Sequence, residues 1–233
     1  MSKKIDKPII ELKNVCKIYK MGDVEVKALC DMDLVVKKGE FLSIMGPSGS
    51  GKSTAMNMIG ALDIPTRGKI LLEGKDISQL AESDLAQIRG KKIGFIFQQF
   101  NLIPTLTAIE NIMLPMIFQN IPRSQRFNRA KKLLEMVELG ERIHHKPTEL
   151  SGGQQQRVAI ARSLANDPEV ILADEPTGNL DSKTGHTVMD FLKKLHQDEG
   201  KTIIMVTHDE NLAKKADRTE YLLDGTIVKK LKK

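Results

Sequence analysis

The chain has 233 residues, of which 40% are hydrophobic and 28% charged, and 36 Lys and Arg against 30 Asp and Glu give a formal net charge of +6. This length suits one domain, or one domain with a substantial insertion, and it provides a core that needs no disulfides or metals. The composition excludes a mainly disordered chain. Seven Phe, two Tyr and no Trp argue against a surface that stacks nucleic-acid bases.

Cysteine use and hydropathy exclude two further classes. Cys16 and Cys30 form no disulfide framework and match no zinc spacing, so we expect both to be small, buried and reduced. We expect neither a secretory signal nor a membrane span, because no apolar run approaches about 18 residues. The lysines at the chain ends, such as Lys232 and Lys233, are expected to be solvated, with attraction to phosphate or an anionic membrane as the alternative.

The first hundred residues are patterned mainly as strands. We predict strands over residues 9–19, 32–36, 40–45, 69–72 and 93–97 and a helix over 52–61. From about 107 to 149 the pattern becomes helical, with prolines between the helices and apolar residues three or four apart over 123–139. This part is predicted to be a helical insertion.

After the insertion, strands and helices alternate again. We predict helices over 154–166, 182–197 and 210–215, strands over 170–173 and 202–206, and a hairpin of 221–223 with 226–229. Such alternation implies a mostly parallel sheet with helices on both faces, so the fold class is α/β.

The sharpest motif lies between strand 40–45 and helix 52–61 and fits the phosphate-loop pattern G-x-x-x-x-G-K-[ST]. It consists of Gly46, Pro47, Ser48, Gly49, Ser50, Gly51, Lys52, Ser53 and Thr54. The glycines let successive N–H groups point at one anion, and the helix start adds partial positive charge. Lys52 is expected to reach the β- and γ-phosphates and the Ser53 hydroxyl to ligate Mg²⁺. The alternative is a glycine-rich turn that binds nothing.

Two acids, Asp174 and Glu175, end the apolar strand 170–173. Carboxylates at the carboxyl end of a parallel strand lie where ligands bind. We expect Asp174 to hold Mg²⁺, directly or through water, and Glu175 to polarise an attacking water. The alternative is an acidic helix start before Pro176.

A third motif begins another helix and consists of Ser151, Gly152, Gly153 and Gln154, after Leu150. Its exposed N–H groups at a helix start would form a second anion site. The alternative is an ordinary N-cap followed by a flexible turn, and the residues alone do not decide between the two.

With these motifs in this order, the chain resembles the nucleotide-binding subunit of an ATP-binding cassette (ABC) transporter over essentially its whole length. Four more positions match the family: Tyr19, Gln98, Asp181 and His208. The resemblance implies a P-loop NTPase fold with a RecA-like core, an antiparallel β subdomain and an inserted α-helical subdomain. Residues 1–98 and 150–233 would form the catalytic core with its β subdomain, and 99–149 the helical subdomain.

The resemblance also implies roles in ATP hydrolysis. Tyr19 would stack on adenine, and Gln98 would reach Mg²⁺ and the attacking water and sense the membrane partner. His208 would contact the γ-phosphate, and Glu175 would be the catalytic base.

Two chains are implied as well. Ser151 and Gly153 of one chain would contact the γ-phosphate held by the phosphate loop of the other, and Asp181 would lie in a loop that crosses between subunits. ATP would therefore join a head-to-tail homodimer, and hydrolysis would release it.

Residues 97–107, Glu110, Asn111 and 175–181 are similar to the branch of LolD, MacB and FtsE types, although Gly178-Asn179 departs from the Ser-Ala of the wider family. This implies a subunit on the cytoplasmic face of the membrane that powers export or force transmission through a separate permease of the MacB, FtsX or LolCE type. Four apolar residues are candidates for the groove that receives the permease's coupling helix, with core packing as the alternative: Leu102, Ile103, Leu106 and Ile112.

Other classes fit less well. No nucleic-acid partner is expected, because the segment between Lys52 and Ser151 lacks the heptads and cysteine pairs of DNA-repair cassettes. A translation factor would carry two cassettes, and a kinase has no use for the Ser151 motif or His208. A mechanotransmitting regulator of extracytoplasmic cell-wall enzymes shares every motif and stays open as the alternative function.

Overall fold

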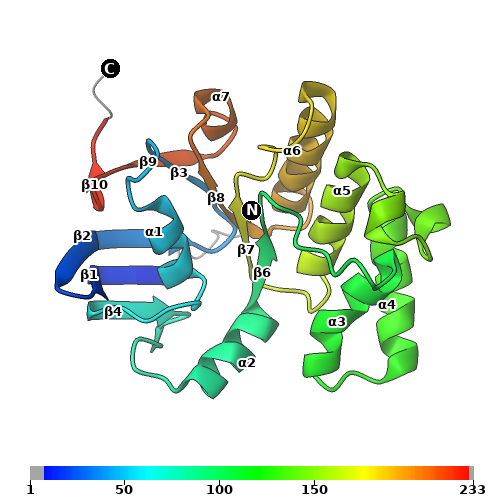
Figure 1. Ribbon diagram of the computed structural model, residues 1–233, viewed down its shortest axis with the longest axis horizontal. Coiled ribbons are helices and arrows are strands. Elements are labelled where there is room, and N and C mark those ends of the chain that lie inside the picture. The colour runs from blue at the N-terminus through cyan, green and yellow to red at the C-terminus, as the bar shows by residue number, and fades with distance from the viewer. Residues whose placement is uncertain (1–7, 231–233) are drawn as a thin grey trace, which may run out of the picture. The chain divides into compact units, whose positions relative to one another are not determined.

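The computed structural model describes residues 8–230, which divide into two compact units (Figure 1). Unit 1 comprises the described residues up to Ala86 and from Gly200 onward, and unit 2 comprises Gln87–Glu199. Lys232 and Lys233, for which we predicted solvated side chains, lie outside the described residues.

Unit 1 contains an antiparallel sheet with strand order β2-β1-β4-β5. Its strands are β1 (Pro8–Met21), β2 (Val24–Lys37), β4 (Arg67–Leu72) and β5 (Lys75–Asp76). Alternate residues of β2 are buried from Met32 onward, and this alternation faces one side of the sheet toward the core. The predicted antiparallel β subdomain near the N-terminus is confirmed.

The other strands of unit 1 follow the order β10-β9-β3-β8. They are β3 (Phe41–Met45), β8 (Thr202–Thr207), β9 (Arg218–Leu223) and β10 (Thr226–Val228). Strand β3 runs parallel to both β8 and β9, and every residue of β3 and β8 is buried. Helix α1 (Lys52–Ile59) follows β3, and α7 (Glu210–Ala213) follows β8. The predicted hairpin at the end is formed by β9 and β10, with Asp224 and Gly225 both at positive φ.

Unit 2 pairs two parallel strands, β6 (Ile93–Ile96) and β7 (Val170–Asp174). Its main helices are α3 (Ala108–Phe118), α4 (Arg123–Met136), α5 (Gly152–Ser163) and α6 (Ser182–Gln197), with short 3₁₀ turns at Gly140–Arg142 and Pro147–Glu149. Helices α3, α4 and α5 pack against one another (Figure 1). The helical character predicted for 107–149 is confirmed, whereas the subdomain boundaries at 98 and 150 remain a prediction.

One helix, the start of strand β2 and the burial of Cys30 differ from the sequence expectation. Helix α2 (Glu82–Lys92), which carries the chain from unit 1 into unit 2, was missed because only Leu85 on it is buried, so no apolar period marks it. Strand β2 begins eight residues earlier than predicted; its first four residues, in which Val24 and Val26 alternate with Glu25 and Lys27, are all exposed. Cys16 is buried as expected, but Cys30 is only partly buried, and both are free thiols.

Of the four residues predicted to line a groove, Ile112 is fully buried in unit 2, so core packing holds for this position. Ile103 is 38% exposed, and Leu102 and Leu106 are half-buried.

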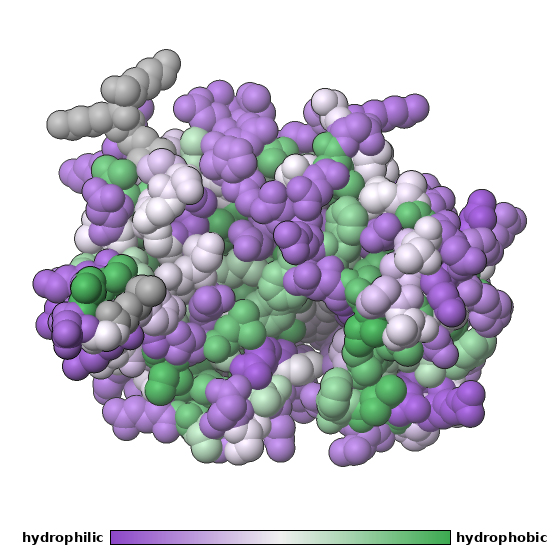
Figure 2. All heavy atoms as spheres, viewed as in Figure 1, coloured by the Kyte–Doolittle hydropathy of each residue, from purple (hydrophilic) through white to green (hydrophobic). Residues whose placement is uncertain are grey.

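No helix among residues 8–230 is long and apolar enough to cross a bilayer. Figure 2 shows hydrophobic side chains scattered among hydrophilic ones on the face drawn.

One buried polar residue, Asn111 on α3, organises the loop before that helix. Its side chain is completely buried, and its Oδ1 accepts a hydrogen bond from Ile103 N at 2.8 Å. Its Nδ2 donates to the carbonyl oxygens of Ile103, Leu106 and Thr107 at 3.0–3.2 Å. One side chain therefore supplies four of the hydrogen bonds to this loop's backbone.

We predict that Asn111→Leu lowers the free energy of unfolding by about 2–3 kcal/mol, because the variant leaves several buried backbone groups without partners. Urea unfolding followed by circular dichroism measures this. Asn128→Leu, at an exposed position of α4, is the matched control and is expected to change stability by less than about 0.5 kcal/mol. Equal effects of the two substitutions would show that Asn111 does not hold the loop.

Candidate functional site

The phosphate-loop motif forms the turn from the buried strand β3 into helix α1. Gly51 has φ +97°, and a Cβ there would lie 2.5 Å from the carbonyl oxygen of Ala28, so only glycine fits. A Cβ on Gly46 would lie 2.3 Å from the carbonyl oxygen of Leu222. Gly51 is also the N-cap of α1 and has no side chain to occupy the first N–H groups of the helix. This is the geometry that binds a phosphate through backbone N–H groups.

The Lys52 ammonium lies over this loop. Its Nζ donates hydrogen bonds to the carbonyl oxygens of Gly46 at 2.8 Å and Pro47 at 2.7 Å. Ser53, the next residue, has an exposed side chain at the start of α1. An ammonium and a hydroxyl are thus held at the same helix end as the loop N–H groups, as the motif predicts.

Strand register brings His208 to the same edge of unit 1 as the phosphate loop. In the parallel pair of β3 and β8, Met45 lies opposite Thr207, so Gly46 and His208 are the next residues of neighbouring strands. The backbone N–H of Asp209 donates to the Thr207 hydroxyl at 3.1 Å, which fixes the chain direction after His208. His208 itself is exposed.

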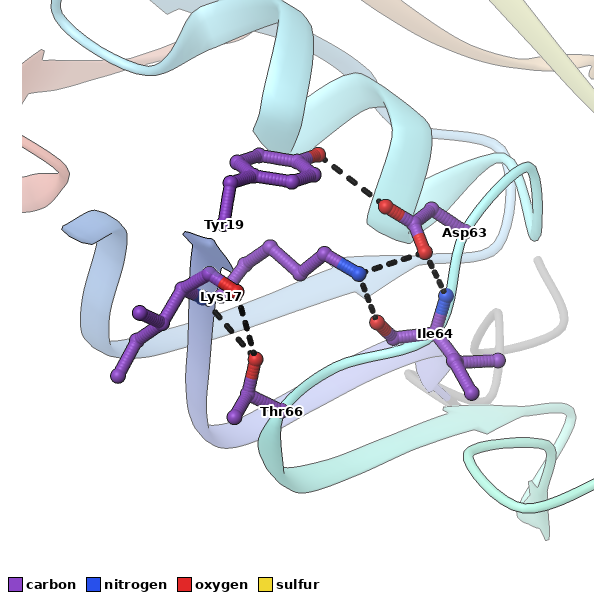
Figure 3. Close-up of polar contacts among 6 residues, drawn as sticks. Lys17, Tyr19, Asp63, Ile64 and Thr66 are labelled. Carbon is purple, nitrogen blue, oxygen red and sulfur yellow. Dashed lines mark hydrogen bonds and ion pairs between the residues drawn. The ribbon is translucent and has the colours of Figure 1, made fainter. Parts of the chain in front are cut away.

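Tyr19, the expected adenine-stacking residue, belongs to a polar cluster that sequence reasoning missed (Figure 3). Its hydroxyl donates to Asp63 Oδ2 at 3.1 Å. Lys17 Nζ donates to Asp63 Oδ1 at 2.7 Å and to the Ile64 carbonyl oxygen at 2.9 Å, and it lies 5.0 Å from the centroid of the Tyr19 ring. The missed partners, Lys17 and Asp63, are ordinary surface types in the sequence, and no local motif marks them.

The pKa values of Tyr19 and Asp63 in this cluster are shifted in opposite directions. Partial burial and then the Asp63 carboxylate raise the pKa of Tyr19. Partial burial would raise the pKa of Asp63 as well, but the Lys17 ammonium and the Ile64 N–H together hold it below the usual value. Asp63 is therefore a carboxylate at neutral pH, and Tyr19 is a neutral hydrogen-bond donor.

Unit 2 brings Gln98 and the two strand acids to one edge. Ile96 and Ala173 are opposite each other in the parallel pair of β6 and β7, so Asp174, the last residue of β7, and Gln98 and Glu175 all lie at the carboxyl ends of neighbouring strands. Glu175 has φ +43°, a strained value for a residue with a side chain. Such strain is typical of functional positions.

The loop after Glu175 is tied to the Gln98 segment. Asn179 Nδ2 donates to the Gln98 carbonyl oxygen at 2.9 Å, and a Cβ on Gly178 would lie 2.9 Å from Gln98 Nε2. The Gly178-Asn179 pair, at which the sequence departs from the wider family, therefore joins two of the predicted site segments. Gln156 on α5 adds a third link, because its Nε2 donates to the Pro176 carbonyl oxygen at 2.6 Å.

Ser151 and Asp181 are both N-caps. Ser151 Oγ accepts from Gln154 N at 3.3 Å and Gln154 Oε1 accepts from Ser151 N at 2.9 Å, which forms a capping box at the start of α5. Asp181 caps α6, and its two hydrogen bonds from Thr184 hold its pKa below the usual value. Ser151 is thus an N-cap, but Gly152 and Gly153 after it belong to helix α5 and form no flexible turn, and the second anion site remains a prediction.

The oxygen atoms of Ser53 and Asp174 suit a Mg²⁺ ion that is bound together with a nucleotide, and not a metal ion enclosed by protein ligands alone. Among residues 8–230, no group of three or more His, Cys, Asp and Glu could hold a metal ion by itself. Mg²⁺ keeps several waters and is bound through one or two protein oxygens together with substrate phosphates. The Ser53 hydroxyl and the Asp174 carboxylate are donors of that kind, so the chemistry of the residues fits the predicted ion.

The structure thus gathers the predicted residues in two groups. Unit 1 holds the phosphate loop, His208 and Tyr19, and unit 2 holds Gln98, Asp174, Glu175 and the Ser151 and Asp181 caps. The role assigned to each residue remains a prediction.

Comparisons with known proteins give one consistent result. The family model described as "ABC transporter" matches residues 29–178. An uncharacterized ABC transporter ATP-binding protein of Thermotoga maritima is 53% identical over 221 residues, covering 95% of this chain and 94% of that protein. The macrolide export ATP-binding/permease protein MacB of Brucella melitensis is 49% identical over 221 residues, but the chain covers only 34% of its length.

A solved structure agrees with these relatives. The dimeric structure of a post-hydrolysis state of the ATP-binding cassette MJ0796, bound to ADP and Pi, has a TM-score of 0.88 and 53% sequence identity. It covers 96% of this chain and 98% of the solved chain. MJ0796 is a protein of Methanocaldococcus jannaschii.

The shifted pKa of Asp63 makes a pH prediction. Because its folded pKa lies below the unfolded value of about 3.9, the carboxylate adds stability above that pH and loses it as the pH falls through the folded pKa. We expect the gap in unfolding free energy between the parent and Asp63→Asn to narrow below about pH 4.

Urea unfolding at a series of pH values from 7 to 2.5 measures this gap. Asp190→Asn, which removes an exposed carboxylate of α6, is the matched control. A gap between parent and Asp63→Asn that keeps its size down to the lowest pH would show that the ion pair with Lys17 adds no stability.

Proposed function

The chain belongs to the ABC transporter family of ATP-binding proteins, and we propose from this that it hydrolyses Mg-ATP as one half of a head-to-tail homodimer that drives a separate membrane permease. The observation that carries the proposal is the phosphate loop. Its left-handed Gly51, the helix start behind it and the Lys52 ammonium form a ready anion site in unit 1. The match to an ADP- and phosphate-bound cassette supports a nucleotide as the anion.

In this proposal the loop N–H groups and Lys52 bind the β- and γ-phosphates, and Tyr19 stacks on the base. Gln98 orients the attacking water, and Glu175 takes its proton as the water oxygen attacks the γ-phosphorus. His208 donates a hydrogen bond to the γ-phosphate as the bond to ADP breaks. Ser53, Gln98 and Asp174 would hold Mg²⁺, which when bound would neutralise charge on the phosphate oxygens.

Dimerisation follows from the second phosphate-binding motif. We assign Ser151, Gly153 and the neighbouring N–H groups of α5 to the γ-phosphate bound by the partner chain, with Asp181 at the subunit boundary. ATP would then bind the closed dimer more tightly than the single chain, and this difference in affinity is the energy available for work. The dimeric state of the MJ0796 structures supports the arrangement.

We assign the membrane partner to the MacB, FtsX or LolCE type and the chain to the cytoplasmic face of the membrane. MacB relatives contain a domain similar to this chain within a longer ATP-binding and permease protein, which supports a permease of this type as the partner. No observation favours the mechanotransmission alternative over export.

Glu175→Gln is expected to slow ATP turnover by about 10²–10⁴-fold, because an amide cannot accept the proton of the water. ATP binding should persist, so the variant is expected to form dimers with ATP on size-exclusion chromatography. Glu141→Gln, at an exposed 3₁₀ position of unit 2, is the matched control and should turn over like the parent. Parent-like hydrolysis by Glu175→Gln would remove Glu175 from the base role.

Two substitutions at Ser151 separate capping from phosphate binding. Ser151→Asp keeps a good N-cap but places a negative charge at the predicted γ-phosphate contact, so we expect parent-like stability and no ATP-dependent dimer. Ser151→Ala is expected to lower the free energy of unfolding by about 1 kcal/mol through loss of the cap.

Both Ser151 variants are best measured in the Glu175→Gln background, where dimers accumulate. Urea unfolding gives the capping effect, and chromatography with and without Mg-ATP gives the dimer. If Ser151→Asp formed dimers at the same ATP concentration as the protein with Ser151, Ser151 would not contact the nucleotide bound by the partner chain.

A further inference from the structure

We propose that Lys17 and Asp63 are positioning residues that hold the Tyr19 ring in one orientation, so that a nucleotide base stacks on the ring face opposite Lys17. The inference rests on the proposed function, in which Tyr19 is the base-stacking residue. It deepens that function by naming the groups that fix the stacking surface.

Asp63 joins the cluster through both carboxylate oxygens (Figure 3). Oδ2 accepts from the Tyr19 hydroxyl at 3.1 Å, and Oδ1 accepts from Lys17 Nζ and from Ile64 N, both at 2.7 Å. The phenol ring is therefore anchored at its far end by an ionised acceptor, and charge-assisted hydrogen bonds of this kind are the stronger ones. With its hydroxyl end held, the ring can rotate only about its Cβ–Cγ bond.

Lys17 lies over the ring itself. Its Nζ is 5.0 Å from the ring centroid, within the range of a cation–π contact, and it also donates to the Ile64 carbonyl oxygen. The side chains of Lys17 and Asp63 are only 13% and 28% exposed, so this is not a freely solvated surface pair. One face of the Tyr19 ring is thus occupied, and a base can stack only on the other.

The same cluster connects the Tyr19 ring to the phosphate loop through helix α1. Lys17 and Tyr19 are two residues apart on β1, so their side chains leave the strand on the same side. Asp63 follows the C-terminus of α1, the helix that starts at the phosphate loop, and the Asp63 backbone N–H donates to Asn57 of that helix. The stacking surface and the anion site therefore share α1 as a common support.

The loop after Asp63 is fastened to β1 a second time. Thr66 Oγ1 accepts from Ile18 N at 3.0 Å and donates to the Ile18 carbonyl oxygen at 3.4 Å (Figure 3). This bond can hold the loop near β1 without the ion pair, so loss of Asp63 charge should loosen the ring more than the loop.

The experiment compares ligands with and without a base. Isothermal titration calorimetry measures binding of Mg-ATP and of inorganic tripolyphosphate to the parent, Asp63→Asn and Lys17→Met. We expect both variants to bind ATP about five-fold more weakly, a part of the full stacking contribution, and to bind tripolyphosphate as the parent does. In steady-state hydrolysis the effect should fall on KM for ATP rather than on kcat.

A double substitution tests whether Asp63 acts through the ring. With Tyr19→Phe the hydroxyl is gone, so adding Asp63→Asn should weaken ATP binding by less than about two-fold. Asp190→Asn controls for the loss of one negative charge and should leave ATP and tripolyphosphate binding unchanged.

Three results would overturn the inference. Equal weakening of ATP and tripolyphosphate binding, or full additivity of Tyr19→Phe and Asp63→Asn, would mean that the pair merely fastens the loop. Parent-like ATP binding by both single variants would mean that the pair does not position the ring. Failure of the proposed function is distinct, because the parent protein itself would then bind neither ATP nor tripolyphosphate.

Discussion

The turn from β3 into α1 is the constraint on which the arrangement of unit 1 depends. Strand β3 is buried along its whole length between β8 and β9, so its register and direction are fixed by its neighbours. The chain must then reverse into a helix within six residues, which requires the left-handed Gly51. That single turn aims the first N–H groups of α1 and directs Lys52 back over the loop, and the segment after the far end of the same helix brings Asp63 to Tyr19.

Helix α5 has the same importance in unit 2 as the turn from β3 into α1 has in unit 1, because α5 holds three loops. Its start is capped by Ser151, its Gln156 holds the Pro176 carbonyl after the strand acids, and Arg162 donates to the carbonyl oxygens of Phe100 and Asn101. Burial lowers the pKa of Arg162, so its guanidinium needs these carbonyl partners. One helix therefore holds three segments that lie far apart in the sequence.

The sequence predicts those features whose cause is local. Glycines at a strand end, apolar runs in β3, β7 and β8, and the Asp224-Gly225 turn each carry their reason within a few residues, and the corresponding elements are found. Helix α2 buries only Leu85, so it has no local apolar signal. Asp63 lies 44 residues from Tyr19, and a carboxylate that acts across such a distance is invisible to local pattern. The roles of the site residues still rest on the family resemblance, because their chemistry depends on a nucleotide.

Ser151 shows how two interpretations that seemed exclusive in the sequence are chemically compatible. A serine hydroxyl offers two lone pairs and one O–H donor. As the N-cap of α5 it uses a lone pair to accept the Gln154 N–H. Its O–H donor is not consumed by that bond, so the same side chain can cap its own helix and still donate to a phosphate oxygen. An aspartate would cap equally well but has no proton to donate and carries the wrong charge. On the proposed function, a hydroxyl residue such as serine meets both demands at this helix start.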